Sequence, residues 1–128
     1  MEYGKNKGRS KGKFVMVRHD MMESEAWHDL SPYARSVWLV LMKRYNSYNN
    51  GDIPLGVREA AQEGGMSKGK AKDSLDELID KGFLKITIYS SFTCKMKRTR
   101  RWSITHEFYN KKPPSNEWRK WKKIEGKI

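Results

Sequence analysis

The chain has 128 residues and a formal net charge of +12, with a sequence pI of about 9.9. This length leaves room for one small domain with tails, and no apolar run approaches the roughly 20 residues that span a bilayer. The charged N-terminus lacks the apolar stretch of a secretory signal. A single cysteine, Cys94, excludes an intramolecular disulfide and indicates a reducing cytoplasm.

The basic charge is unevenly distributed along the chain. Lys and Arg outnumber Asp and Glu in residues 1–19 and 82–128, whereas residues 20–81 hold slightly more acidic than basic side chains. A soluble domain does not need this asymmetry, and binding to a polyanion explains it most simply. Nucleic acid and an anionic membrane surface are the competing polyanions.

Residues 1–13 interleave Lys and Arg with Gly, Ser and Asn, so we expect a disordered basic arm. The arm follows a phosphate backbone or reaches a minor groove, or it is a solvated tail that aids solubility. Composition does not separate these alternatives. The nucleic-acid-binding candidates in the arm are Lys5, Lys7, Arg9 and Lys11.

The next segments predict a scaffold for the domain. Residues 14–17 are apolar and form an edge strand or a strap, and residues 23–30 form a short helix with Ser24 as its cap. Ser31 and Pro32 start a longer helix that continues to about residue 45. A turn cluster at residues 46–52 follows, with Asn50-Gly51 at its apex, and the short strand after it lies at an edge because Pro54 cannot donate a hydrogen bond.

Residues 57–83 carry the pattern around which the chain is organised. A short helical segment at residues 57–63 is followed by Gly64-Gly65, which cannot extend it cheaply, and Ser67 can cap a second helix. On that helix Ala71, Leu75, Leu78 and Ile79 recur on one inward face, and Gly82 suits the position after its end. This is a helix-turn-helix pattern, whose second helix usually enters the major groove of DNA. The alternative is a plain hairpin of two helices within a helical core.

After Gly82 the apolar period changes from helical to strand-like. Residues 83–89 and 101–105 predict two strands, and the basic segment between them predicts a β-hairpin of the kind called a wing. A basic hairpin alone is weak support, because edge strands often carry lysine to prevent aggregation. The candidate phosphate or minor-groove contacts of the wing are Lys95, Lys97, Arg98, Arg100 and Arg101.

Residues 110–128 leave the predicted domain through Pro113-Pro114. In the tail Trp118 and Trp121 fall on one helical face among basic residues. These tryptophans pack back onto the domain, stack on bases or bind a protein partner, or seat an interfacial helix in a membrane. We therefore expect three parts: a basic arm at residues 1–13, a domain at residues 14–109 and a basic tail at residues 110–128.

Four stretches carry a family resemblance: LSPYARSVWLVLMKRYN, NNGDIPL, REAAQEGGMSKGKAKDSLDELIDKGFLKI and SFTCKMKRTRRWSIT. Over about residues 14–106 the sequence resembles the winged helix-turn-helix domains of small bacterial, phage-borne or plasmid-borne DNA-binding proteins. The resemblance implies a mainly α-helical α+β fold with a small β-hairpin wing, and a location at the bacterial nucleoid. It does not select a role, because the same domain serves transcriptional regulators and replication initiators.

The resemblance places base contacts in the first turns of the second helix. Ser67 and the helix N-terminus suit a phosphate, Lys70 can reach guanine, and Asp73 can accept from a cytosine amine. The stretch departs from the family pattern because it is basic and contains glycine where a threonine is more usual. The acidic residues further along face away from phosphates or toward a protein partner. The candidates are Ser67, Lys68, Gly69, Lys70, Lys72 and Asp73.

These patterns support three functional hypotheses. The first is a sequence-specific binder of double-stranded DNA, acting as a regulator or accessory factor of a mobile element and binding as a homodimer or cooperatively. The second is a replication accessory protein or an RNA-binding protein. The third is a protein-interaction module that uses the acidic helix face and the Trp tail. Scattered His residues and the absence of a phosphate-loop pattern argue against an enzyme, and we expect no metal, no cofactor and no membrane partner.

Overall fold

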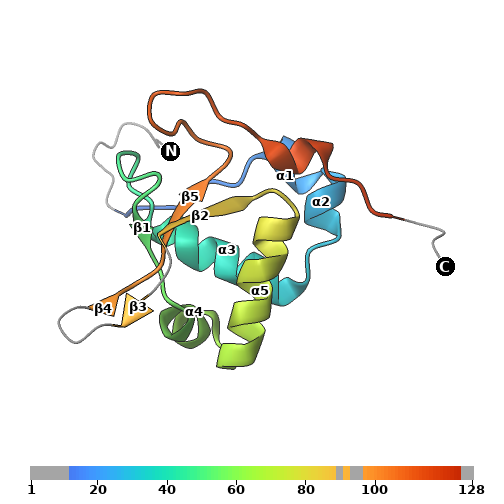
Figure 1. Ribbon diagram of the computed structural model, residues 1–128. Coiled ribbons are helices and arrows are strands. Elements are labelled where there is room, and N and C mark those ends of the chain that lie inside the picture. The colour runs from blue at the N-terminus through green and yellow to red at the C-terminus, as the bar shows by residue number, and fades with distance from the viewer. Residues whose placement is uncertain (1–11, 89–90, 93–96, 125–128) are drawn as a thin grey trace.

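The computed structural model describes residues 12–88, 91–92 and 97–124 (Figure 1). This part of the chain is an α+β fold, as the sequence predicted, and none of its helices is long and apolar enough to cross a membrane. The elements in chain order are α1 (His19–Met22), α2 (Glu25–His28), α3 (Pro32–Arg44), β1 (Ile53–Pro54), α4 (Val57–Gly64), α5 (Lys68–Asp80), β2 (Leu84–Ile88), β3 (Ser91–Phe92), β4 (Lys97–Arg98), β5 (Arg101–Ile104) and the 3-10 helix η1 (Glu117–Lys120).

Serine caps start three of the helices, and all three caps were predicted from the sequence. The hydroxyl oxygens of Ser24, Ser31 and Ser67 accept hydrogen bonds from amides of the first turns of α2, α3 and α5, each at 3.1 Å. Each cap satisfies an amide that the helix itself leaves without a partner. Between α4 and α5, Gly65 adopts a left-handed conformation with φ +71°. The predicted helix, turn and second helix are therefore confirmed.

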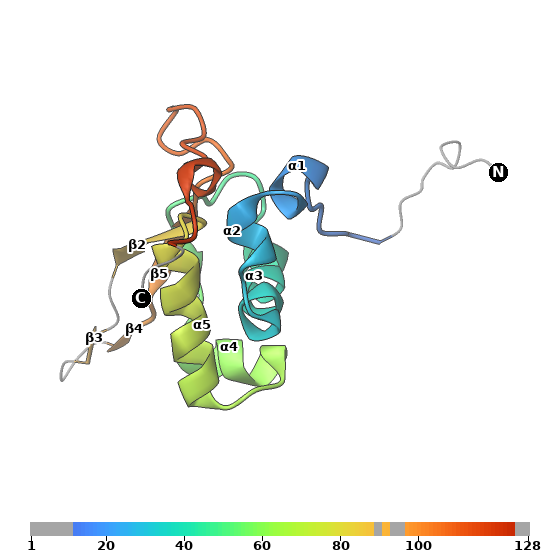
Figure 2. The ribbon, with the colours of Figure 1, turned by 90° about the vertical axis from the view of Figure 1, so that its right-hand side faces the viewer.

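Three strands form a small antiparallel sheet with the order β1-β5-β2. In the register, Ile53 pairs with Trp102 and Leu84 pairs with Ile104. Beyond an irregularity after Ile86, the chain continues into the separate β3–β4 hairpin. The hairpin projects at the left of Figure 1, beside α4, and Figure 2 shows it on the same side of the molecule as α5. The strands predicted at residues 83–89 and 101–105 and the edge position of β1 are confirmed.

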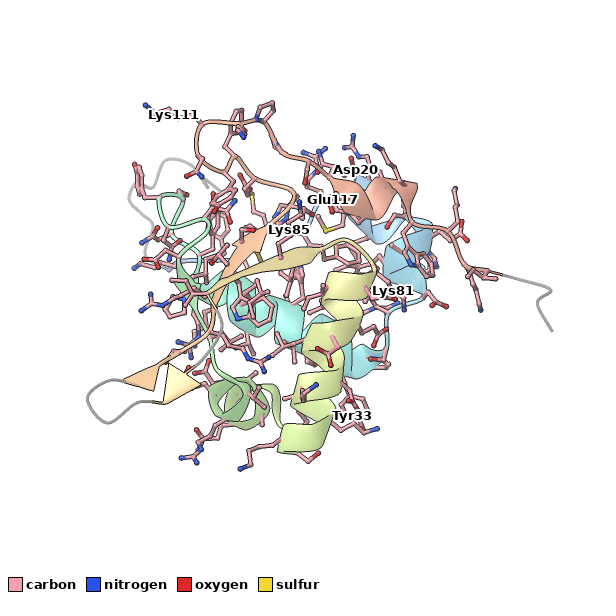
Figure 3. All side chains as sticks on the ribbon, viewed as in Figure 1. Asp20, Tyr33, Lys81, Lys85, Lys111 and Glu117 are labelled. Carbon is pink, nitrogen blue, oxygen red and sulfur yellow. The ribbon has the colours of Figure 1, made fainter. Side chains whose placement is uncertain are left out.

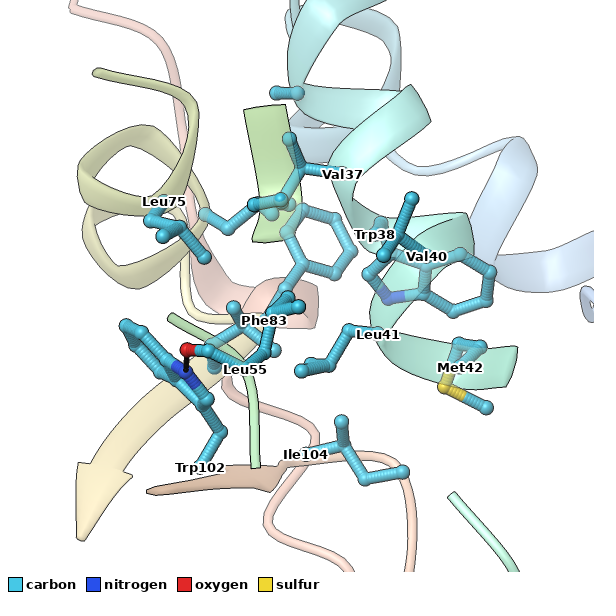
Figure 4. Packing of buried hydrophobic residues seen from close by; sticks show 14 of the residues in the cluster. Val37, Trp38, Val40, Leu41, Met42, Leu55, Leu75, Phe83, Trp102 and Ile104 are labelled. Carbon is cyan, nitrogen blue, oxygen red and sulfur yellow. Dashed lines mark hydrogen bonds between the residues drawn. The ribbon is translucent and has the colours of Figure 1, made fainter. Parts of the chain in front are cut away.

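The core lies between α3, α5 and the sheet (Figure 4). Trp38, Leu75 and Trp102 are completely buried there, and the Trp102 Nε1 donates to the Leu55 carbonyl oxygen at 2.9 Å. Burying a large apolar side chain contributes about 1.5–3 kcal/mol. The inward face of α5 comprises Ala71, Ser74, Leu75 and Leu78.

One expectation about packing is wrong, and one pair of alternatives is decided. Ile79 is 37% exposed, because Ser74 takes a place on the inward face and leaves Ile79 at the margin of the stripe. Residues 14–17 form no strand with another described segment. They are the strap that was the alternative, with Val15 and Val17 packed against the core.

The segment that contains η1 returns to the domain. The Asn116 amide donates to the Thr105 carbonyl oxygen at 2.9 Å, and Trp118 is 2% exposed and stacks on Phe83 with ring centroids 6.2 Å apart. Gly82 has φ +87°, and a Cβ there would lie 2.8 Å from backbone atoms of Glu117 and Trp118. Packing on the domain is therefore the alternative that the structure selects for Trp118.

Asn50 joins the turn before β1 to the segment after β5. Its Oδ1 accepts from the Ile104 amide at 2.7 Å, and its Nδ2 donates to the carbonyl oxygens of Ile104 at 3.1 Å and Phe108 at 2.8 Å. The turn is closed by a hydrogen bond from the Asp52 amide to the Asn49 carbonyl oxygen. The predicted apex at Asn50-Gly51 is confirmed, and Asn50 also serves as a tertiary clamp.

His106 gives the protein a pH-dependent stability. Burial, with a smaller effect of Arg18, lowers the pKa of His106 to about 4 from the ordinary value of 6.5. The Glu107 carboxylate would act in the opposite direction, but at 3.9 Å from Nε2 and largely in solvent it is too weak to offset burial. The unfolded chain therefore binds the proton more tightly, so this stability is complete above about pH 6.5 and is lost as the pH falls toward 4.

We expect the free energy of unfolding to fall by about 2 kcal/mol between pH 7.5 and pH 5. Urea denaturation at the two pH values measures this difference. Glutamine does not titrate, so the free energy of unfolding of the His106→Gln protein should depend much less on pH. The same dependence in both proteins would contradict the assignment. Carboxylates with lowered pKa values, such as Asp20 at about 2, act mainly below this window.

Candidate nucleic-acid interface

The N-terminal half of α5 presents an exposed face opposite its packed one. Lys68, Gly69, Lys70, Lys72 and Asp73 are all exposed, whereas Ala71, Ser74 and Leu75 hold the helix against α3 and α4. A Cβ built on Gly69 would meet only the Ser67 hydroxyl, at 4.0 Å. The backbone of this first turn is therefore open to close approach, and the structure brings together every site residue predicted on this helix.

Two of the three lysines on this face have partners within the chain. The Lys70 ammonium lies 4.7 Å from the ring centroid of Tyr33, which projects from the first turn of α3 beside the lower end of α5 in Figure 3. The Lys72 ammonium lies 2.8 Å from the Asp76 carboxylate, and both side chains are more than half exposed. Exposed pairs of this kind contribute about 0–1 kcal/mol, so both lysines can exchange these partners for a phosphate or a base edge.

Tyr33 was not among the predicted site residues. Nothing in the local sequence identifies it, because its contact with Lys70 depends on how α3 crosses α5. A cation over an aromatic ring gains about 0.5–1 kcal/mol at an exposed site. Tyr33 therefore orients Lys70 and enlarges the exposed surface at this end of α5.

The β3–β4 hairpin carries the second group of predicted contacts. Antiparallel backbone pairing aligns Ser91 with Arg98 and Phe92 with Lys97. Lys95 and the arm residues Lys5, Lys7, Arg9 and Lys11 lie outside the described residues.

The two arginines at the base of the hairpin are partly buried. The Arg100 carbonyl oxygen accepts from the Leu55 amide at 3.1 Å. The Arg101 guanidinium lies 3.3 Å from the Asp52 carboxylate. Both residues therefore hold the hairpin to the strand at the edge of the sheet, whatever else they contact.

The other end of α5 is committed to the fold. The buried Lys81 ammonium lies 2.9 Å from both the Glu77 and the Asp29 carboxylates, and Glu77 accepts from the amide and the hydroxyl of Ser31 at 2.9 and 3.0 Å. Burial alone would raise the pKa of Glu77, but the hydrogen bonds from Lys81 and Ser31 hold it below its usual value. We expected Glu77 on the outward face, directed away from phosphates or toward a protein partner; its carboxylate instead binds Ser31, the N-cap residue of α3, within the chain.

The basic residues around η1 face the acidic residues of α1 and α2. Arg119 lies 3.0 Å from Asp20, and Lys123 lies 3.5 Å from Asp29 while its amide donates to Glu25 at 2.8 Å. The Lys81 ammonium lies 5.2 Å from the ring centroid of Trp121. These charges are compensated within the chain, far from the N-terminus of α5, so this segment strengthens the fold more than it enlarges the basic surface.

In residues 12–88, 91–92 and 97–124, no three His, Cys, Asp or Glu side chains lie close enough together to hold a metal ion. Comparison of the chain with protein-family models, with curated proteins and with solved structures gave no match.

Proposed function

We propose that this protein binds double-stranded DNA through a winged helix, as a transcriptional regulator or accessory factor of a mobile element. The exposed, lysine-rich and glycine-containing face at the N-terminal half of α5 carries the proposal. An α-helix with side chains is about 10–12 Å wide and fits the major groove of B-DNA, which is about 12 Å wide.

The order of the elements supports the winged-helix arrangement. A scaffold helix, an edge strand, two helices joined by a tight turn, and two strands joined by a hairpin follow one another from α3 to β5. The last strand lies between the other two, as the order β1-β5-β2 shows. The hairpin projects on the side of α5, so it can reach the phosphates or the minor groove beside a helix bound in the major groove.

Each residue on the exposed face has a role suited to its chemistry. The helix N-terminus at Ser67 and Gly69 receives a phosphate, and Lys68 and Lys72 neutralise neighbouring phosphates. Lys70 leaves the Tyr33 ring to contact guanine, while Asp73 accepts from a cytosine amine. The competing interaction module is less well supported, because Glu77 and Trp118 make contacts within the chain.

Removing the three α5 lysines should weaken duplex binding strongly. We expect the Lys68→Ala, Lys70→Ala, Lys72→Ala variant to bind a labelled random duplex at least about ten-fold more weakly, which corresponds to about 1.4 kcal/mol or more in total. Its log–log salt slope should fall by about 0.9 for each lysine that contacts a phosphate. Fluorescence anisotropy at several salt concentrations measures both quantities, with single-stranded DNA and structured RNA of matched length alongside.

A charge-matched control separates a specific face from general attraction. Lys111→Ala, Lys112→Ala, Lys120→Ala also removes three exposed positive charges, from segments on the opposite end of the molecule from the start of α5 (Figure 1). This control should keep most of the affinity. Equal loss in the two variants, or stronger binding to RNA or single strands than to duplex, would refute the proposal.

A further inference from the structure

The strap at residues 12–18 exposes large apolar side chains in a strand-like alternation. Phe14 and Met16 are 81% and 72% exposed, whereas Val15 and Val17 between them pack against the core. Single exposed apolar residues are ordinary, but adjacent ones on one outward face mark interaction surfaces. Phe108, which is 62% exposed, lines a hollow together with Phe14 and Met16.

The backbone of the strap is available for strand pairing. Among the described residues, no backbone hydrogen bond joins residues 12–17 to another segment. An extended segment with alternating side chains and unpaired backbone groups is the template to which a further strand adds. The outward apolar side chains would then be covered by alternate side chains of that strand.

Two hollows lie along the strap and share Phe14, Val15, Met42 and Tyr45 in their walls. Their volumes are about 760 and 520 Å³, within the range of roughly 300–1,000 Å³ that ligand pockets occupy. Together with the strap they form one groove, which we call the strap groove. Its walls combine the apolar side chains of Phe14, Val15 and Met42 with polar and charged ones.

The charged side chains that line the strap groove are four basic ones and one acidic one, Glu107. Lys13 and Lys43 line it as exposed side chains. Arg18 and Arg44 line it too, each paired with a carboxylate, Asp20 and Glu63 respectively. The surface therefore complements a partner that alternates apolar and acidic side chains.

Charge repulsion argues against a second copy of the strap, or residues 1–11 of this chain, as the occupant of the strap groove. Two straps paired antiparallel about Val15 and Met16 would set Lys13 of each copy opposite Arg18 of the other, and a parallel pair would set like residues side by side. Residues 1–11 carry four basic side chains and one acidic side chain, so they too are repelled by the rim. Nucleic acid supplies negative charge but leaves the apolar side chains of the groove without matching side chains along an extended backbone.

We propose that the strap groove binds an extended segment of a partner protein with alternating acidic and apolar side chains, which pairs with residues 14–17 as an added β-strand. In Figure 2 the strap lies on the opposite side of the molecule from α5 and the hairpin. The groove therefore remains accessible when α5 is bound to DNA, and the proposal does not depend on the proposed function.

The test uses a fluorescein-labelled synthetic peptide in which glutamate alternates with valine and leucine. Anisotropy with the full chain should show saturable binding. A peptide with lysine in place of glutamate, and one with proline at alternate positions, should each bind at least ten-fold more weakly, because the first reverses the charge and the second cannot pair as a strand.

Protein variants locate the binding. Phe14→Ser combined with Met16→Ser should weaken binding of the acidic peptide at least ten-fold. Leu39→Ser, at an exposed apolar position of α3 outside the groove, should leave that binding unchanged. The variant with Phe14→Ser and Met16→Ser should melt close to the temperature of the parent protein, because both side chains are largely exposed; Leu39→Ser, which replaces a side chain that is 45% exposed, should lower the melting temperature more.

Four outcomes would overturn the proposal. The lysine or proline peptide could bind as tightly as the acidic one, or the Phe14 and Met16 changes could leave binding intact. Duplex DNA could displace the acidic peptide from the Lys68→Ala, Lys70→Ala, Lys72→Ala variant, which would assign the groove to nucleic acid. Sedimentation could reveal a dimer that Phe14→Ser dissociates, which would assign it to a second copy.

Discussion

Replacing Trp118 with alanine should lower the free energy of unfolding by about 3–5 kcal/mol, the range for deleting a large buried aromatic side chain. Trp118 is 2% exposed and stacks on Phe83, which in turn lies edge-on to Trp27 with ring centroids 5.9 Å apart. Alanine would leave a cavity between the end of α5, α2 and η1. Urea denaturation followed by circular dichroism measures the loss.

Two controls make the result specific. Ile124→Ala changes an apolar side chain of the same segment that is 79% exposed, and it should cost less than about 0.5 kcal/mol. Trp118→Phe keeps an aromatic ring and removes an indole N–H that has no hydrogen-bond partner among the described residues. It should therefore cost clearly less than alanine. A Trp118→Ala protein as stable as the parent would show that the segment after residue 115 does not pack on the domain.

Asn50→Ala should also be strongly destabilising, by about 3–5 kcal/mol. The change removes hydrogen bonds to the part-buried amide and carbonyl oxygen of Ile104, each of which costs about 1–3 kcal/mol when left without a partner. It also removes an exposed hydrogen bond to the Phe108 carbonyl oxygen, which water can replace. Denaturant titration at neutral pH measures the effect. Hydrogen exchange should show the segment after β5 opening before the helices.

Asn50→Asp is the matched variant for this clamp. The carboxylate keeps an acceptor for the Ile104 amide but cannot donate to the carbonyl oxygens, against which it is repelled. We therefore expect it to be destabilising as well, so that the donor side of the clamp dominates. If Asn50→Asp matched the parent protein in stability, the two donated hydrogen bonds would contribute little.

Local chemistry explains what the sequence predicted well. Ser31 followed by Pro32, and Ser67 after two glycines, specify helix starts within a few residues, and their caps appear in the structure. Asn50-Gly51 and the alternation after Gly82 likewise depend on neighbouring residues. These signals are local and do not depend on which elements meet in space. They therefore suffice to predict the order of the helices and strands along the chain.

The parts that could not be predicted depend on contacts between distant segments. Lys70 meets Tyr33, and Glu77 meets Ser31, only because α3 crosses α5. An acidic residue on the outward face of a helix has the same sequence pattern whether it faces water or caps another helix. Composition left three fates open for Trp118. It packs on the domain because the backbone of Glu117 and Trp118 lies directly against Gly82, which has no side chain.

The division of α5 into two halves also determines where its sequence can change. Side chains at Lys68, Gly69, Lys70, Lys72 and Asp73 touch little of the fold, and substitutions at such exposed positions usually change stability by less than about 0.5 kcal/mol. Glu77, Leu78 and Lys81 are held by α3, the core and Asp29. Substitutions in the first half of the helix can therefore change the chemistry of its exposed face without a compensating change elsewhere, whereas the second half is constrained by its contacts.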